Sequence, residues 1–95
     1  MSDHPINDLD ALTADYRVAF LRFLPRQQEV ALTTGYELGR RAFRGRVSVL
    51  ELARIHHEVL LEVLEETAPE EVAGVAASAS TFFLEVLSTY DMAQR

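Results

Sequence analysis

The sequence predicts an all-α fold, a four-helix bundle in which neighbouring helices pack antiparallel. No stretch of useful length alternates polar and apolar residues with the period of two that a half-buried strand requires. The 95 residues include only four glycines and three prolines, and the turn signals concentrate near Pro25, Gly45 and Pro69. Four segments of helical length remain, joined by loops short enough to favour antiparallel packing.

The first helix is expected over residues 8–24. Pro25 ends it, because proline disfavours helical geometry in the preceding residue and lacks a backbone donor. Its apolar side chains recur at helical spacing and gather on one narrow stripe, which is a normal core face. They are Leu9, Leu12, Tyr16, Ala19, Phe20 and Phe23.

The second helix is expected over residues 26–44, and Gly45 suits the position just after its end. Its inner face carries mostly small residues: Ala31, Gly35, Leu38, Gly39 and Ala42. A glycine inside a helix costs about 1 kcal/mol relative to alanine, so we expect another helix to approach this face closely. Polar residues, among them Glu29 and Thr33, occupy the outer face.

The third helix is expected over residues 49–66 and begins with a capping box of Ser48 and Glu51. Apolar residues cover most of its circumference, far beyond the stripe of about 100° that a one-sided surface helix shows. The remaining polar strip consists of Glu51, Arg54, Glu58, Glu62, Glu65 and Glu66. Such a run of charges is typical of a solvated face.

The fourth helix is expected over residues 68–93, with a second capping box of Thr67 and Glu70 and with Pro69 in its first turn. Its expected core residues are Val72, Val75, Ala79, Phe82, Phe83, Val86 and Tyr90. A further apolar shoulder has no place in the same core: Ala73, Ala77, Leu84 and Leu87. The last two helices thus carry more apolar surface than one bundle covers, so we expect a homodimer.

Composition places residues 1–95 in one small domain of ordinary globular character. The formal net charge of −6 disfavours nucleic acid as a partner, and the absence of cysteine excludes disulfides, thiolate metal sites and a cysteine nucleophile. We find no apolar run of about 18 residues and no basic N-terminal region. We therefore expect no membrane partner and a cytoplasmic location.

His56 and His57 are the first candidates for chemistry. His56 lies at the centre of the third helix's apolar arc, which favours a core histidine hydrogen-bonded to a neighbouring helix. Neither histidine has a metal ligand four residues away or a glutamate three residues before it, so the spacings of helical di-iron and zinc sites are absent. His57-Glu58 resembles the phosphoacceptor dipeptide of dimeric histidine kinases, and a phosphotransfer module using His57 remains an alternative.

Other catalytic patterns are missing from the sequence. Phosphate-binding loops and serine nucleophile elbows do not occur. The single basic cluster, Arg40, Arg41, Arg44 and Arg46, suits the negative end of a helix dipole. We therefore expect a protein that is not an enzyme, with no metal and no cofactor.

Four segments in order carry a resemblance that spans the chain from about residue 12 to residue 95. They are GYELGRRA at 35–42, IHHEVL at 55–60, FFLEVL at 82–87 and YDMAQ at 90–94. In this order and spacing they resemble the N-terminal domain of RsbU-type phosphatases, regulators of bacterial stress signalling.

The resemblance implies a dimeric four-helix domain that lies upstream of a PPM-type serine phosphatase, directly or through a sensor domain. It implies binding of RsbT, a small GHKL-type switch kinase, which activates the phosphatase and thereby frees a sigma factor. The family's partner surface involves the second and fourth helices, and by position it points to Glu29, Thr33 and Leu84. A plain dimerisation bundle with no further partner is a third possibility.

Overall fold

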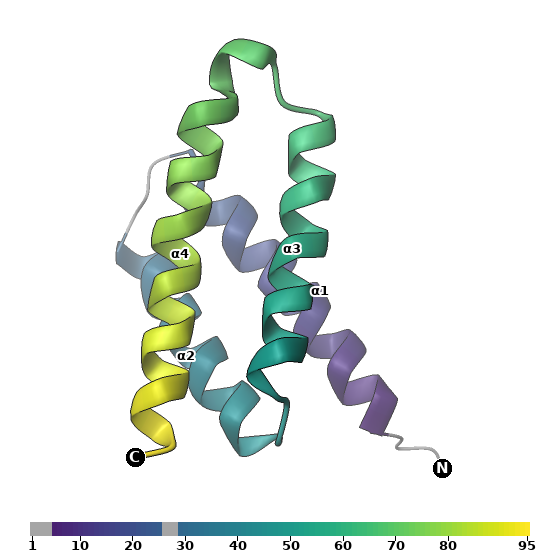
Figure 1. Ribbon diagram of the computed structural model, residues 1–95, viewed down its shortest axis with the longest axis vertical. Coiled ribbons are helices and arrows are strands. Elements are labelled where there is room, and N and C mark those ends of the chain that lie inside the picture. Colours follow the sequence, from purple (N-terminus) through teal and green to yellow (C-terminus); the bar gives the residue numbers. More distant parts are fainter. Residues whose placement is uncertain (1–4, 26–28) are drawn as a thin grey trace.

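The computed structural model describes the backbone of residues 5–25 and 29–95 and the side chains of residues 9–25 and 32–95. Within these ranges the structure is all-α (Figure 1). Its elements are α1 (Pro5–Phe23), α2 (Glu29–Arg44), α3 (Val49–Glu65), the short 3-10 helix η1 (Pro69–Glu71) and α4 (Val72–Ala93). The predicted all-α fold and the four predicted helices are confirmed. Helix α1 begins earlier than expected, at Pro5, because proline is favoured in the first helical position.

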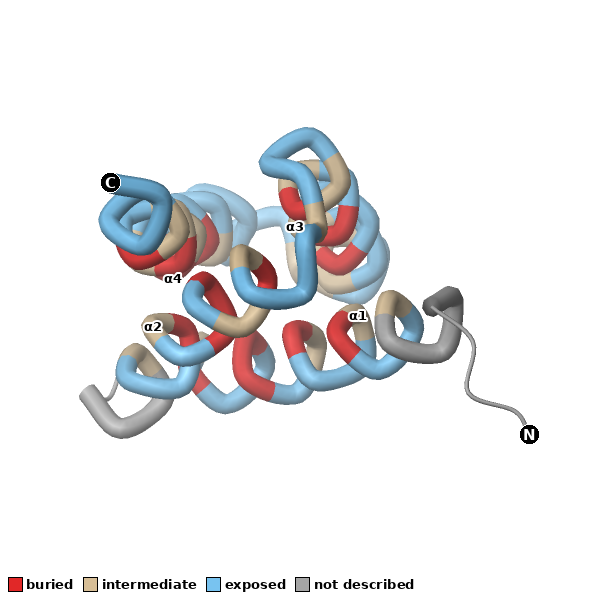
Figure 2. Tube along the Cα trace, turned by 90° about the horizontal axis from the view of Figure 1, so that it is seen from below, coloured by how far each residue is buried: buried red, intermediate tan, exposed pale blue. Residues whose placement is uncertain are grey.

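The helices form two layers, α1 with α2 and α3 with α4, and the buried residues lie between them (Figure 2). The aromatic centre of this core is Phe82 of α4, whose ring contacts those of Tyr16, Phe20 and Phe23 from α1. The remaining buried apolar side chains are Leu12, Ala19, Leu38, Ala42, Leu52, Ile55, Val59, Ala79 and Val86.

The expected antiparallel packing of neighbours is found for α1 with α2 and for α3 with α4, but the most extensive contact has a different geometry. Helix α2 packs most closely against α4, and the two helices run in the same direction. Gly35 lies against Phe82, while farther along both helices Gly39 lies against Thr89. The reason is the small-residue face of α2, which lets α4 approach more closely than a face of larger side chains would.

Helix α2 ends in a Schellman motif whose left-handed residue is one position later than predicted. The Val47 amide bonds the Ala42 carbonyl at 2.9 Å, and the Arg46 amide bonds the Phe43 carbonyl at 3.1 Å. Arg46 has φ 63°, whereas no glycine has a positive φ among the described residues. Gly45 is therefore the last residue before the reversal and not the residue that makes it.

At the first of the two predicted capping boxes the Ser48 cap is confirmed, while the Glu51 carboxylate bonds Arg54. The Ser48 hydroxyl accepts a hydrogen bond from the Glu51 amide at 3.1 Å, as the first box predicts. The second box is wrong, because the Thr67 hydroxyl instead donates to the Val63 carbonyl of α3 at 2.6 Å. The chain then enters η1 at Pro69, and its cap residue, Ala68, provides no side-chain hydrogen bond.

Five residues of α4 differ in burial from the prediction based on helical periodicity. Val72 is exposed, Val75, Phe83 and Tyr90 are only half-buried, and Leu87, predicted outside the core, packs partly against it. The helical segment Pro69–Ala93 is also long and apolar enough, by length and composition, to cross a membrane, contrary to the expectation that no such segment exists. One such segment is weak evidence for a span, because a helix that contributes to a globular core meets the same criteria.

Candidate interaction surface

The three residues predicted to contact a partner lie on two helices that pack together. Glu29 begins α2, and its side chain lies outside the described residues. Thr33 is exposed on α2, and Leu84 is 62% exposed on α4. Thr33 and Leu84 both point away from the core that α2 and α4 share. The structure thus places two of the predicted side chains in solvent on neighbouring helices.

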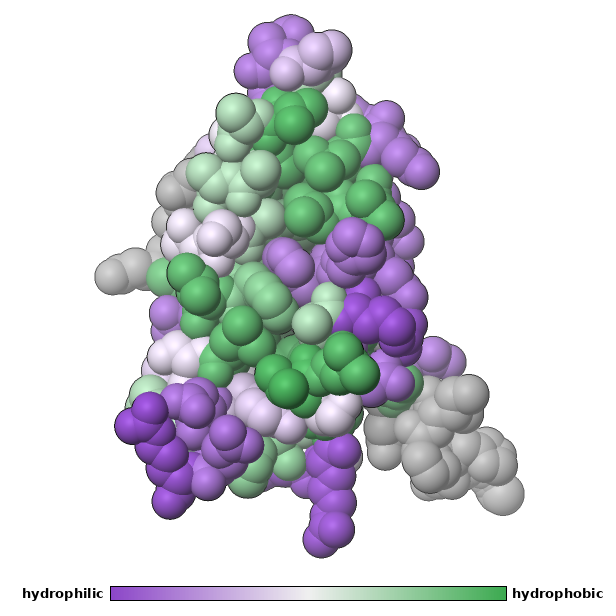
Figure 3. All heavy atoms as spheres, in the orientation of Figure 1, coloured by the Kyte–Doolittle hydropathy of each residue, from purple (hydrophilic) through white to green (hydrophobic). Residues whose placement is uncertain are grey.

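The outer face of the α3–α4 layer is rich in apolar side chains. Figure 3 shows this face, with hydrophobic residues spread over both helices. Exposed apolar residues on these helices include Leu50 at 78% and Leu61 on α3, and Leu84 on α4. Contiguous apolar surface on a soluble protein marks an interaction site more often than scattered apolar residues do. The predicted excess of apolar surface on these two helices is therefore present.

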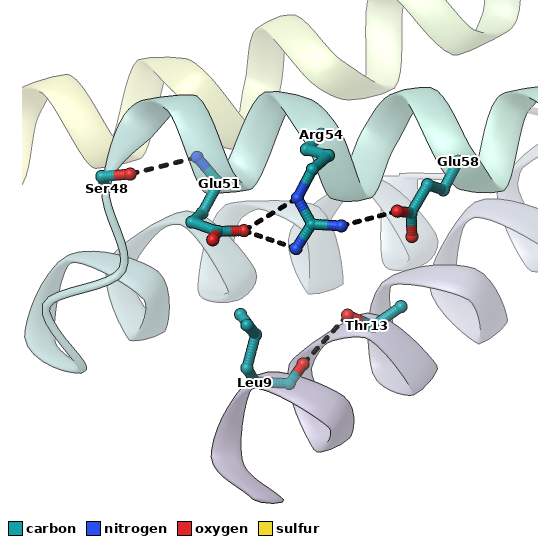
Figure 4. A network of polar contacts seen from close by, with 6 residues as sticks. All are labelled: Leu9, Thr13, Ser48, Glu51, Arg54 and Glu58. Atoms are coloured by element: carbon teal, nitrogen blue, oxygen red, sulfur yellow. Dashed lines mark hydrogen bonds and ion pairs between the residues drawn. The ribbon is translucent and has the colours of Figure 1, made fainter. Parts of the chain in front are cut away.

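Residues of the polar strip of α3 form ion pairs with one another along the helix (Figure 4). Arg54 donates to Glu51 at 2.6 and 3.1 Å and to Glu58 at 2.6 Å. Arg17 of α1 forms a two-point pair with Glu62 at 2.8 and 3.1 Å, and this hydrogen bonding lowers the pKa of the Glu62 carboxyl. These carboxylates lie on a solvated face, as the sequence predicts.

His56 connects three helices. Its Nδ1 lies 2.6 Å from the hydroxyl of Tyr16 on α1, and its ring stacks on Phe83 of α4 with centroids 4.1 Å apart. Burial, and secondarily the neighbouring His57, lowers the pKa of His56 to about 4. Burial also raises the pKa of Tyr16, so the pair is neutral at physiological pH. The predicted hydrogen bond from His56 to a neighbouring helix is confirmed, but the residue is half-buried at the edge of the core and not inside it.

His57 is placed differently from its neighbour. It is exposed on α3, where a phosphodonor could reach its ring. Across the described side chains, no group of three or more histidine, aspartate or glutamate residues could hold a metal ion. The chemistry open to these residues is therefore surface chemistry at His57 or recognition of another molecule.

The sequence did not predict one grouping that the fold creates. Phe43 of α2 and Tyr90 of α4 meet edge to face with ring centroids 5.6 Å apart, beside Arg40 and Arg44. The arginines and Phe43 are neighbours in the sequence, but Tyr90 comes from a helix more than forty residues away. Only the close packing of α2 on α4 brings these side chains together.

Comparison with known families accounts for nearly the whole of this helical arrangement. Residues 14–93 match the model of a family described as the N-terminal domain of the phosphoserine phosphatase RsbU. The chain belongs to the RsbU N-terminal domain family. The match covers about half of α1 and all of α2, α3 and α4, which confirms the resemblance identified in the sequence. No curated protein and no solved structure matches the chain.

Membership in the RsbU N-terminal family defines the general role of these four helices. They correspond to the regulatory N-terminal domain of a phosphoserine phosphatase, and not to its catalytic part. The contacts of His56 agree with a regulatory role, because its imidazole packs between helices, against Tyr16 and Phe83.

Proposed function

We propose that this RsbU N-terminal domain is a dimeric, non-catalytic interaction domain that binds an RsbT-like GHKL switch kinase. Binding activates a PPM-type serine phosphatase, attached directly, through a sensor domain or as a separate protein, in cytoplasmic stress and sigma-factor signalling. The family match supports this role, and the single structural observation that carries the surface assignment is the 62% exposure of Leu84. Thr33 and Glu29 extend the proposed contact onto α2.

The proposed dimer uses the exposed apolar residues of α3, among them Leu50 and Leu61, and leaves Leu84 of α4 to the kinase. A side chain such as Leu50, which is 78% exposed, gains about 25 cal/mol for each Å² removed from water. In a twofold homodimer each protomer covers the other's copy of the same apolar residues, so this is the simplest arrangement that buries them.

The proposed mechanism is a conformational change without a chemical step. Kinase binding across α2 and α4 changes the relation between the two protomers, and the last turns of α4, from Leu87 to Met92, transmit the change. The two states differ in the kinase's affinity for them, so binding shifts their populations. The tight contact between α2 and α4 supports this path, because Thr89 of α4 donates to the Tyr36 carbonyl of α2 at 2.8 Å.

The test of kinase recruitment is binding of the purified RsbT-type kinase of the source organism to wild-type protein and to Leu84→Arg. We expect the variant to remain a dimer by light scattering and to lose the kinase. Val18→Arg is the matched control, because Val18 is 48% exposed on α1 in the other layer. Loss of the dimer in Leu84→Arg would instead indicate a plain dimerisation bundle. Equal kinase binding by all three proteins would contradict the proposed surface.

The alternative function, a histidine phosphotransfer module, is supported by the exposure of His57 on α3. Incubation with a phosphodonor separates it from recruitment. A recruitment domain takes up no acid-labile phosphate, whereas a phosphotransfer module is labelled and loses the label in His57→Gln.

A further inference from the structure

A groove lies between the C-terminal halves of α2 and α4, away from Thr33 and Leu84. Its volume is about 390 Å³, within the range of about 300–1,000 Å³ found for ligand sites. It is lined by Tyr36, Arg40, Phe43, Arg44, Thr89, Met92 and Ala93. A second hollow next to it is lined by Phe43, Arg44, Arg46 and Tyr90. Shared residues make the two hollows one continuous surface, which we call the arginine groove.

The charge of the arginine groove is opposite to that of the whole chain. The chain has 15 acidic and nine basic residues, yet the groove's lining includes three arginines and no carboxylate. Among the described residues, Arg40, Arg44 and Arg46 form no ion pair, whereas Arg41, which does not line the groove, pairs with Asp15 at 2.6 Å. Exposed, unpaired guanidinium groups are suited to two-point binding of carboxylates.

The helix dipoles do not account for this positive charge. The ends of α2 and α4 each contribute about half a negative charge, which three arginines exceed by about two charges. The last carbonyls of α2 are moreover satisfied by the Schellman bonds of Arg46 and Val47. Positive charge is therefore left over at the groove for an outside anion.

The groove also presents apolar side chains and stays partly open to solvent. The Phe43 ring packs edge to face on Tyr90, and Met92 is 55% exposed beside them. A site for a small metabolite encloses most of its ligand, whereas Arg40, Arg44 and Met92 are all exposed here. An open groove of this kind fits a side chain that remains attached to a longer chain.

We propose that the arginine groove binds an acidic segment of a partner protein. One apolar side chain of that segment lies between Phe43 and Met92, and flanking carboxylates pair with Arg40 and Arg44. This site is additional to the proposed kinase surface and does not depend on it. The apolar anchor supplies burial, and the arginines supply orientation and a faster association rate.

The test measures fluorescence anisotropy of a set of labelled octapeptides, in each of which one Phe, Leu or Met is flanked by Asp or Glu at a different spacing. Matched peptides with Ser at the apolar position, and inorganic phosphate as competitor, complete the design. We expect acidic peptides with an apolar residue to bind, and to bind more weakly at about 300 mM than at about 50 mM salt. Arg40→Ala and Arg44→Ala should each weaken binding about fivefold, as for an exposed ion pair of about 1 kcal/mol.

Arg22→Ala is the matched control, since it removes the same charge from an exposed arginine of α1 that lines neither hollow of the arginine groove. Binding by no peptide in the set, or binding unchanged in Arg40→Ala and Arg44→Ala, would overturn the proposal. Equal binding of the Ser peptides would indicate non-specific charge attraction and would also overturn it. If inorganic phosphate displaces the peptides when it supplies the same concentration of negative charge, the groove binds a small anion and the proposal is wrong. If the protein self-associates and Arg44→Ala abolishes this association, the groove binds a second copy of the chain and the proposal is likewise wrong.

The two proposals fail separately. Kinase binding retained by Arg40→Ala and Arg44→Ala, together with peptide binding retained by Leu84→Arg, is the expected pattern. If Arg40→Ala and Arg44→Ala no longer bind the kinase, the arginine groove is part of the kinase surface, and the proposal of a separate site is wrong.

Discussion

The hydroxyl of Tyr16 lies 2.6 Å from Nδ1 of His56, and this contact joins α1 to α3 beside the core. His56 also stacks on Phe83 of α4, so one imidazole holds three helices in register. Because the ring is kept neutral by burial, its protonation and the packing of these helices are linked.

This linkage predicts that the domain loses stability at mildly acid pH. The pKa of His56 is about 4 in the folded state and about 6.5 in the unfolded chain. Between these values the unfolded state binds a proton that the folded state does not, so stability falls as the pH falls from 6.5 toward 4. Urea unfolding should show a loss of about 1 kcal/mol between about pH 7 and about pH 5, roughly half of what the full pKa difference gives, because solvent partly screens the half-buried ring. His56→Gln should lack this loss, and an equal loss in both proteins would contradict the assignment.

The surroundings of Gly39 and Gly74 predict opposite effects on stability when each is replaced by alanine. A Cβ at position 39 would overlap with the Thr89 hydroxyl and the Val86 carbonyl, so we expect Gly39→Ala to cost at least about 2 kcal/mol. A Cβ at Gly74, in the first turns of α4, would meet nothing within 4 Å. Gly74→Ala should therefore stabilise the domain by about 0.5–1 kcal/mol. Thermal unfolding of both variants tests this difference, and a stable Gly39→Ala would refute the close approach.

Arg46 should be replaceable by glycine with a gain in stability. Its φ of 63° lies in the left-handed region, which costs a non-glycine residue about 1–2 kcal/mol. We expect Arg46→Gly to stabilise the domain by about 0.5–1 kcal/mol, because glycine's greater freedom in the unfolded chain offsets part of the gain. Arg40→Gly, with the same charge change inside α2, should destabilise by about 1 kcal/mol. Chemical denaturation gives both values, and a destabilised Arg46→Gly would contradict the Schellman geometry.

The features predictable from the sequence are those set by local spacing. The inner stripe of α1 and the Ser48 cap follow from residues a few positions apart, and both are confirmed. The small face of α2 predicts a close approach but not its partner. Its contact with α4 in the same direction depends on the fit of Gly35 against Phe82, a pairing across nearly fifty residues. Helical periodicity likewise predicts Phe83 inside the core, but its position facing His56 leaves it only half-buried.

Adjacent phenylalanines in α4 should therefore differ strongly in their contribution to stability. Phe82 is fully buried and contacts Tyr16, Phe20 and Phe23, so Phe82→Ala should cost about 3–5 kcal/mol by loss of burial and creation of a cavity. Phe83 is half-buried, and its main aromatic contact is the His56 ring. Phe83→Ala should cost only about 1–2 kcal/mol, because folding removes less apolar surface of Phe83 than of Phe82 from water. Urea unfolding of the two variants at neutral pH measures both costs. Equal costs would mean that α4 is rotated about its axis relative to the described packing, with Phe83 sharing the core position of Phe82.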